Sequence, residues 1–199
     1  MNLRTARILV AAGAFVAGLV LCAAVVLLVV GRDGAPSLPQ VAAIGGPFSL
    51  TDHNGRTVTE QDLKGRPFLV FFGYTNCPDF CPTTMFEISE VLKKLGPDGD
   101  RTRALFITVD PERDTPAALK DYVSSFDPRI IALTGEPEAI AAVAKAYRAY
   151  YRRVPLKDGG YTMDHLVLVY LMGKDGRFVS RFNLNRPIDA SAAELRKYL

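Results

Sequence analysis

The sequence lacks an excess of either charge over most of its length. Its 199 residues hold 24 Lys and Arg against 21 Asp and Glu, and Arg4, Arg7 and Arg32 account for the difference. Residues 33–199 are therefore charge-balanced, which gives them no electrostatic reason to bind a phosphate backbone. The chain also contains no internal repeat and no low-complexity tract. We expect one ordinary domain with an appendage, and no nucleic-acid partner.

Residues that bind soft metals or carry thiol chemistry are few. The chain has three cysteines and two histidines. Cys22 lies inside an apolar segment, where we expect it to be inert, so Cys77 and Cys81 are the remaining thiols. His53 stands beside a predicted turn, and turn residues are usually solvated. His165 begins an apolar run, so a loop folded over the cysteines can bring it to them.

The first apolar segment lacks any charge from Ile8 to Val30, a run of 23 residues. A helix of this length spans about 34 Å, which exceeds the roughly 30 Å of a bilayer core. A cleavable signal peptide has a shorter apolar region of about 7–15 residues. A lipoprotein signal would place a small residue, not Leu21, before Cys22. We expect an uncleaved transmembrane anchor over residues 8–30, after a short N-terminus over residues 1–7.

The charges that flank this segment predict its orientation. Arg4 and Arg7 precede it, whereas Arg32 and Asp33 follow it and nearly cancel. Positive charge stays on the inner side, so the N-terminus is expected in the cytoplasm. A single-pass anchor in the cytoplasmic (inner) membrane then places the C-terminal domain on the periplasmic side. Residues 31–46 are rich in Gly and Pro and are expected to form a linker.

From residue 47 onward, short apolar runs alternate with helical patterns. Apolar runs predict strands over residues 67–72, 104–109, 130–133, 165–171 and 177–182, and helical spacing predicts helices over 83–95, from 116, over 138–151 and over 191–198. The Asn54-Gly55 pair predicts an N-terminal β-hairpin. This pattern predicts that residues 47–199 form an α/β domain, with a mixed central sheet flanked by helices.

Cys77 and Cys81 directly follow the buried strand predicted over residues 67–72, at the end where open α/β sheets bind ligands. Residues four apart share one face of a helix and can also converge in the turn that enters it. A helix N-terminus stabilises thiolates. A structural disulfide is the simplest alternative, but it would close a very short loop and stabilise the fold little. Redox chemistry or metal binding explains the pair better.

The cysteine spacing and His165 favour metal over redox chemistry. A thioredoxin-type oxidoreductase usually has two residues between its cysteines, whereas this chain has three. Two thiolates and one imidazole form a soft set that suits Cu(I), and Cu(II) with one additional ligand. Zinc is compatible, but its structural sites normally have four ligands. We expect Asp164 to orient His165, Met163 to be a possible weak ligand, and Met85 to pack in the core.

A charged turn follows the second predicted strand. Asp110, Glu112, Arg113 and Asp114 are interpreted as a solvated turn, because surface ion pairs are common. The alternative is a loop that faces a partner.

Four motifs in this order resemble the Sco/SenC family: GYTNCPDFCPTTM at 73–85, TVDPERDTP at 108–116, LTG at 133–135 and MDHLVLVYLMGKDGRF at 163–178. The resemblance covers most of residues 45–199. One departure is Leu166, which stands where relatives commonly have a small polar residue.

The resemblance implies a thioredoxin-like fold in which Cys77, Cys81 and His165 bind one copper ion per chain, as Cu(I) or Cu(II), with Asp164 as the acidic neighbour. It also implies a role in assembling the dinuclear copper centre of cytochrome c oxidase. The implied partners are the copper-bearing oxidase subunit and another periplasmic copper donor. The alternative implied role is a thiol–disulfide oxidoreductase, in which Cys77 attacks and Cys81 resolves, that keeps the cysteines of these partners reduced.

Overall fold

The computed structural model divides the chain into two compact units, Met1–Ala42 and Ala43–Leu199. The structure describes residues 2–30, 43–157 and 159–199. The two units are described separately.

The first unit contains one long helix, α1 (Leu3–Val30). Among the described residues, no helix combines the length and the apolar character needed to cross a bilayer. The membrane anchor expected over residues 8–30 is therefore not shown. Most of the expected linker, residues 31–42, lies outside the described residues.

The second unit is built on a seven-stranded mixed sheet with the strand order β2-β1-β5-β4-β3-β8-β9. The strands are β1 (Ser49–Asp52), β2 (Thr57–Thr59), β3 (Phe68–Gly73), β4 (Arg103–Thr108), β5 (Ile130–Thr134), β8 (Val169–Met172) and β9 (Phe178–Arg181). The central strands β3, β4 and β5 run parallel, whereas β8 pairs antiparallel with β3 and β1 pairs antiparallel with β5. The expected N-terminal hairpin is β1–β2. The mixed sheet predicted from the apolar runs is therefore confirmed.

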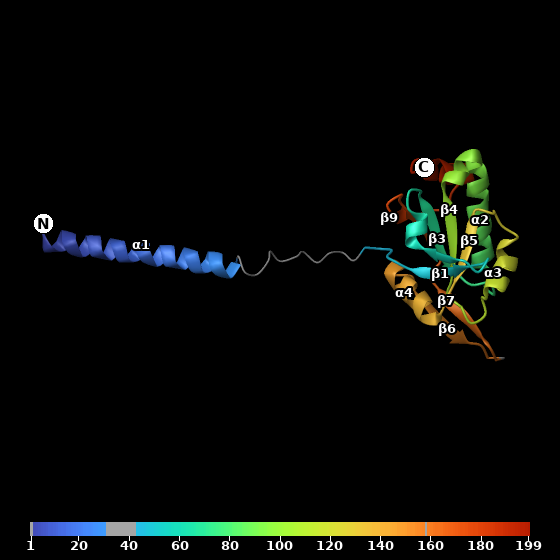
Figure 1. Cartoon of the computed structure of the whole chain (residues 1–199), viewed down its shortest axis with the longest axis horizontal. Coiled ribbons are helices and arrows are strands. Elements are labelled where there is room, and N and C mark those ends of the chain that lie inside the picture. The colour runs from blue at the N-terminus through green and yellow to red at the C-terminus, as the bar shows by residue number, and fades with distance from the viewer. Residues whose placement is uncertain (1, 31–42, 158) are drawn as a thin grey trace. The chain divides into compact units, whose positions relative to one another are not determined.

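Helices cover both faces of this sheet. They are α2 (Phe80–Leu95), α3 (Pro116–Val123), α4 (Pro137–Tyr147) and α5 (Ile188–Arg196), with short 3-10 helices η1 (Glu60–Leu63) and η2 (Gly96–Arg101). Helices α2 and α3 lie on one face and α4 on the other (Figure 1), and α5 packs against α2. All six residues of β3 are buried, as expected for a strand covered on both faces. Thr115 caps α3 by accepting a hydrogen bond from the Ala118 N–H, because an N-cap side chain replaces a missing helical partner.

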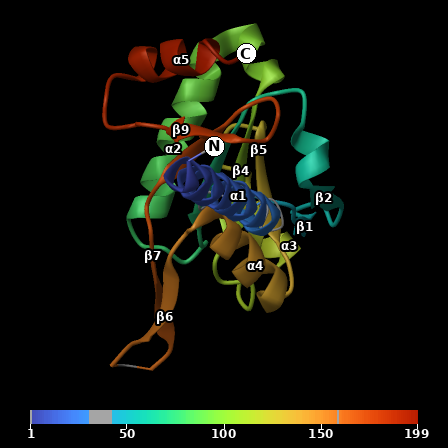
Figure 2. The same ribbon diagram turned by 90° about the vertical axis from the view of Figure 1, so that its left-hand side faces the viewer.

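The structure differs from the sequence expectation between residues 147 and 169. Helix α4 ends at Tyr147, because Arg148 adopts a left-handed conformation with φ of 54°. The expected loop before residue 165 is a two-stranded ribbon, β6 (Tyr151–Pro155) and β7 (Tyr161–His165). It projects from the end of the domain (Figure 2). His165 therefore ends β7 and does not begin a strand, so that part of the expectation is wrong.

The expectation for His53 is also wrong. This side chain is half-buried, and its Nδ1 accepts a hydrogen bond of 3.2 Å from the Ala132 N–H. It joins the β1–β2 turn to β5 and is not a solvated loop residue.

Candidate metal centre

Three side chains that are far apart in the sequence converge at one end of the sheet. The ligand atoms of Cys77, Cys81 and His165 all lie within 4.8 Å of one another. Cys77 lies in the loop between β3 and α2, Cys81 in the first turn of α2, and His165 at the end of β7. Both cysteines are free thiols. The fold therefore brings together the three residues that the sequence singled out.

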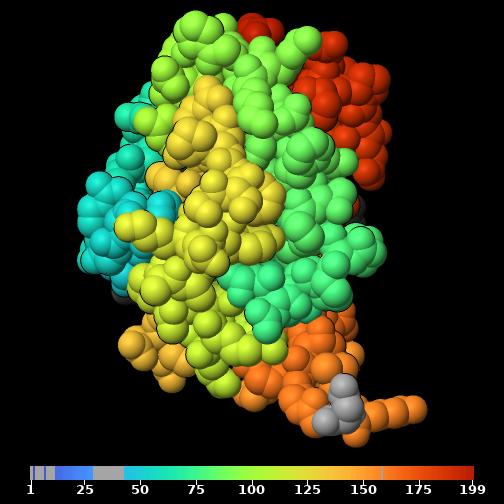
Figure 3. Space-filling view, turned by 90° about the vertical axis from the view of Figure 1, so that its right-hand side faces the viewer, coloured from blue at the N-terminus to red at the C-terminus, as the bar shows by residue number. Residues whose placement is uncertain are grey.

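The two cysteines differ in exposure. Cys81 is fully buried, at 0% exposed, and its Sγ lies 3.4 Å from Nε2 of His165. Cys77 is half-buried, and its N–H donates to the Tyr74 carbonyl at 3.2 Å. In the space-filling view, the start of α2 lies beside the base of the β6–β7 ribbon (Figure 3). An incoming group therefore meets Cys77 before Cys81.

Burial governs the protonation of this centre. Burial raises the pKa of the Cys81 thiol far above its usual range, and the neighbouring Cys77 adds to the rise. Burial also lowers the pKa of His165, because a low dielectric disfavours charge. The stabilisation of a thiolate expected at a helix N-terminus is therefore outweighed at Cys81. At neutral pH the imidazole is neutral and ready to bind a metal, whereas Cys81 must first lose a proton.

Aromatic rings enclose His165. The rings of Phe71 and Tyr74 meet the imidazole edge to face, with centroid distances of 6.2 and 5.7 Å. The Nδ1 of His165 is buried and has no hydrogen-bond partner among the described residues. An apolar shell of this kind limits access of water to a metal site.

Asp164 lies beside the centre but does not hydrogen-bond to the imidazole. Its exposed carboxylate pairs with Arg152 on β6 at 3.3 Å, because neighbouring residues of a strand point to opposite faces. Its negative charge does act on His165 by raising the pKa of the imidazole, against the larger effect of burial. A role for Asp164 in orienting His165 stays a prediction.

Gly73 is a determinant of the centre that the sequence interpretation missed. A Cβ at this position would lie 2.8 Å from Sγ of Cys81 and 2.7 Å from the Phe106 ring. Only glycine lets the chain approach this closely. The sequence feature that could have identified it is the position of Gly73, a glycine between the apolar strand and the cysteine loop.

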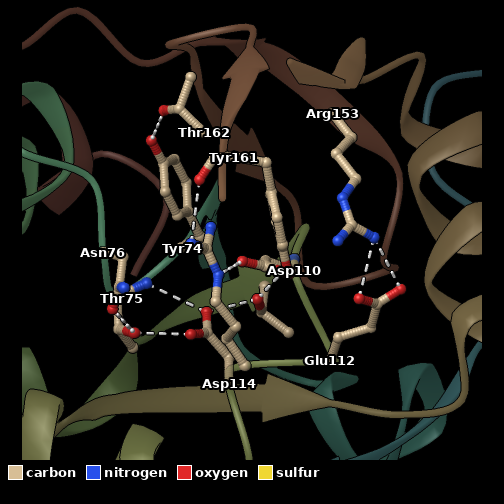
Figure 4. Close-up of polar contacts among 11 residues, drawn as sticks. Tyr74, Thr75, Asn76, Asp110, Glu112, Asp114, Arg153, Tyr161 and Thr162 are labelled. Atoms are coloured by element: carbon tan, nitrogen blue, oxygen red, sulfur yellow. Dashed lines mark hydrogen bonds and ion pairs between the residues drawn. The ribbon is translucent and has the colours of Figure 1, made fainter. Parts of the chain in front are cut away.

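The charged turn after β4 is only partly solvated: Glu112 is exposed and Arg113 half-buried, whereas Asp110 and Asp114 are buried. The interpretation as a solvated turn is therefore wrong for the two aspartates. Asp110 is 3% exposed and Asp114 is 0% exposed. Asp114 accepts hydrogen bonds from the Thr75 N–H at 3.0 Å, the Thr75 hydroxyl at 2.6 Å and the Thr108 hydroxyl at 2.6 Å (Figure 4). Burial raises the pKa of Asp114 despite these bonds. Because Thr75 is two residues from Cys77, Asp114 fixes the loop that carries this cysteine.

A second contact joins this loop to the β6–β7 ribbon. The Tyr74 and Thr162 hydroxyls are 2.8 Å apart (Figure 4). This hydrogen bond links the end of β3 to the strand that carries His165. The cysteines and the histidine are therefore held by one connected set of contacts.

The donor set fits copper. Two sulfurs and one imidazole nitrogen form a soft group that suits Cu(I). Met85 is buried in the core, as expected. The full burial of Cys81 also favours a soft metal bound by soft ligands over a hydrated ion.

Comparisons with known proteins agree with this geometry. The structure of Bradyrhizobium japonicum ScoI with copper bound is 61% identical, with a TM-score of 0.77, and is matched over 79% of this chain and 100% of that one. Arabidopsis thaliana ScoI with copper bound is 39% identical, with a TM-score of 0.71, over 78% of this chain and 100% of that one.

Among curated proteins, the mouse protein SCO1 homolog, mitochondrial, is 44% identical over 146 residues, which are 72% of this chain and 51% of the relative. The chain spans about half the length of the first such relatives it matches. The sequence profile of the SCO1/SenC family matches residues 36–199. The fold, the Cys-Cys-His group and these similarities agree, and the chain belongs to the SCO1/SenC family.

Proposed function

We propose that this chain is a copper chaperone that carries one copper ion on Cys77, Cys81 and His165. The observation that carries the proposal is the convergence of these three ligand atoms within 4.8 Å. Copper is the cargo in this scheme. The protein supplies two thiols, one of them fully buried, and a neutral imidazole.

The residues also suit release of the cargo. Three ligands leave copper able to accept a further one, so a partner's ligand can add before a ligand of the chaperone leaves. Cys77 is the more exposed of the two thiols, so exchange is expected to begin there. We propose that the acceptor is the copper-bearing subunit of cytochrome c oxidase, at its dinuclear centre, and that another periplasmic protein supplies the copper.

The proposal includes the location. We propose that residues 8–30 anchor the chain once in the cytoplasmic membrane, residues 31–46 form the linker, and residues 47–199 form the copper-binding domain on the periplasmic side. The support is the uncharged run from Ile8 to Val30. Alkaline carbonate extraction of membranes tests the anchor: the chain should stay in the pellet, and its release into the supernatant would contradict it.

The competing role is a thiol–disulfide oxidoreductase that acts on the same oxidase subunit or copper donor. The two free thiols of Cys77 and Cys81 permit it. Dithiol exchange needs no imidazole, so His165 distinguishes the two roles.

His165→Ala is expected to weaken copper binding by about 100-fold or more, because loss of a ligand exceeds the 10–100-fold typical for loss of a group that orients one. The affinity is measured by competition with a Cu(I) chelator under anaerobic conditions. Oxidase assembly in cells that carry this variant should fall in parallel. His53→Ala is the matched control and should leave affinity and assembly unchanged. Normal oxidase assembly with His165→Ala would contradict the chaperone role and favour the oxidoreductase.

A further inference from the structure

The strand that carries His165 lies outside the main sheet. The β6–β7 ribbon forms a separate two-stranded sheet, and two-stranded ribbons are marginally stable by themselves. The position of His165 therefore depends on the side chains that join this ribbon to the rest of the domain.

Tyr161 makes four contacts where the ribbon meets the rest of the domain. Its ring lies between two guanidinium groups, with the Cζ of Arg113 3.9 Å and the Cζ of Arg153 3.5 Å from the ring centroid. Its hydroxyl donates to Oδ1 of Asp110 at 2.8 Å, and its carbonyl accepts from Nη1 of Arg113 at 3.1 Å. We call Asp110, Arg113, Arg153 and Tyr161 the tyrosine clamp (Figure 4).

The clamp is fixed to the core at one side. The Asp110 side chain is 4% exposed and is paired with Nε of Arg113. Asp110 follows the buried end of β4, and its N–H donates to the Thr108 hydroxyl at 2.9 Å. On the outer side, Arg153 is held by Glu112 at 3.0 Å. Tyr161 is thus held between the buried Asp110–Arg113 pair on the inner side and the Arg153–Glu112 ion pair on the outer side.

Tyr161 and His165 share one face of β7. Side chains at i, i+2 and i+4 of a strand point the same way, so Tyr161, Met163 and His165 face the domain together. Met163 between them is buried, at 8% exposed. Four residues of strand span about 13 Å, so a strand held at Tyr161 defines where the imidazole lies relative to Cys81.

We propose that Tyr161 is a positioning residue: the tyrosine clamp holds β7 so that His165 lies over Cys77 and Cys81, and thereby sets how tightly the site retains copper. This inference rests on the proposed function, because it concerns the same copper site. Tyr161 touches no ligand atom and acts only through the strand.

The test compares full-length variants loaded with copper. Tyr161→Leu removes the ring and the hydroxyl, and is expected to weaken copper binding by about 10–100-fold. In the Cu(II)-loaded variant, the imidazole nitrogen coupling in the electron paramagnetic resonance spectrum should be weakened, while the thiolate-to-copper absorption remains. Tyr161→Phe keeps the stacked ring. It should therefore retain the imidazole coupling and bind copper with an affinity within a few-fold of the wild type.

Tyr150→Leu is the matched control, because Tyr150 precedes β6 and is 54% exposed. It should change neither affinity nor spectrum. Arg153→Met is a second variant for the case that Tyr161→Leu fails to fold, and it should weaken binding by about tenfold with partial loss of the coupling. Wild-type affinity and full imidazole coupling in a folded Tyr161→Leu protein, or in Arg153→Met where only this variant folds, would overturn the clamp. A wild-type chain that binds no copper would instead reject the proposed function.

Discussion

Cys77→Ala and Cys81→Ala are each expected to abolish stable copper binding, whereas the wild-type chain should retain one copper ion after dialysis against a chelator. Both sulfurs lie within 4.8 Å of the other ligand atoms, and removal of either leaves one thiolate and one imidazole. Such a pair retains Cu(I) poorly against a chelator, because thiolates provide most of the affinity for a soft metal. Metal analysis together with thiol titration of the anaerobic protein measures the result.

Cys22→Ala is the matched control, because it removes the third cysteine, which lies in α1. It should leave one copper ion per chain. Cys81→Ala should also lower the thermal stability more than Cys77→Ala, since Cys81 is fully buried and its loss leaves a cavity. Full copper occupancy in the Cys77→Ala/Cys81→Ala double variant would refute the assignment of this site.

Asp114→Ala is expected to lower the free energy of unfolding by about 2–4 kcal/mol. The substitution removes a fully buried carboxylate that accepts three hydrogen bonds from Thr75 and Thr108. A buried donor left without its partner typically loses about 1–3 kcal/mol, and the Thr75 N–H has no rotation by which to find another acceptor. Urea denaturation measures the change, and copper binding should weaken as well, because Thr75 belongs to the Cys77 loop.

Asp121→Ala is the control for this prediction, since Asp121 is an exposed residue of α3. It should change the stability by no more than about 0.5 kcal/mol. A loss as small as this in Asp114→Ala would contradict the structural role of Asp114.

The pH dependence of unfolding gives Asp114 a second signature. Burial raises its pKa in the folded state above the unfolded value, so the folded state binds the proton more tightly. The contribution of Asp114 to the free energy of unfolding is therefore most favourable below about pH 4, the pKa of an aspartate in the unfolded chain. It falls as the pH rises toward the pKa of Asp114 in the folded state. Asp114→Ala should remove this decline, so the difference in stability between wild type and variant should be larger at the acidic end of this range.

Part of this structure follows from local sequence. Apolar runs such as residues 67–72 predicted the buried strands, because continuous apolar side chains suit a strand covered on both faces. Thr115 and Pro116 predicted the start of α3, because capping depends only on adjacent residues. Local sequence also identified Cys77 and Cys81 as a candidate site, because they lie four residues apart at the end of a predicted strand.

Tertiary structure decided the rest. His165 lies 84 positions after Cys81, and its 3.4 Å contact with that thiol depends on the β6–β7 ribbon. The alternation of apolar and polar residues in the two strands of this ribbon was too short to distinguish them from a loop. Asp110 and Asp114 looked like solvated turn residues, but packing buried them against Thr75, Thr108 and Tyr161.

The sequence by itself determined the fold class, the mixed sheet and the identity of the three converging side chains, because backbone preferences and apolar periodicity act over a few residues. Only the tertiary structure decided how these side chains meet and that Gly73 gives Cys81 room. It also decided that burial raises the pKa of Cys81 and lowers the pKa of His165. These properties depend on the dielectric and on contacts between residues far apart in the chain, which no local pattern encodes.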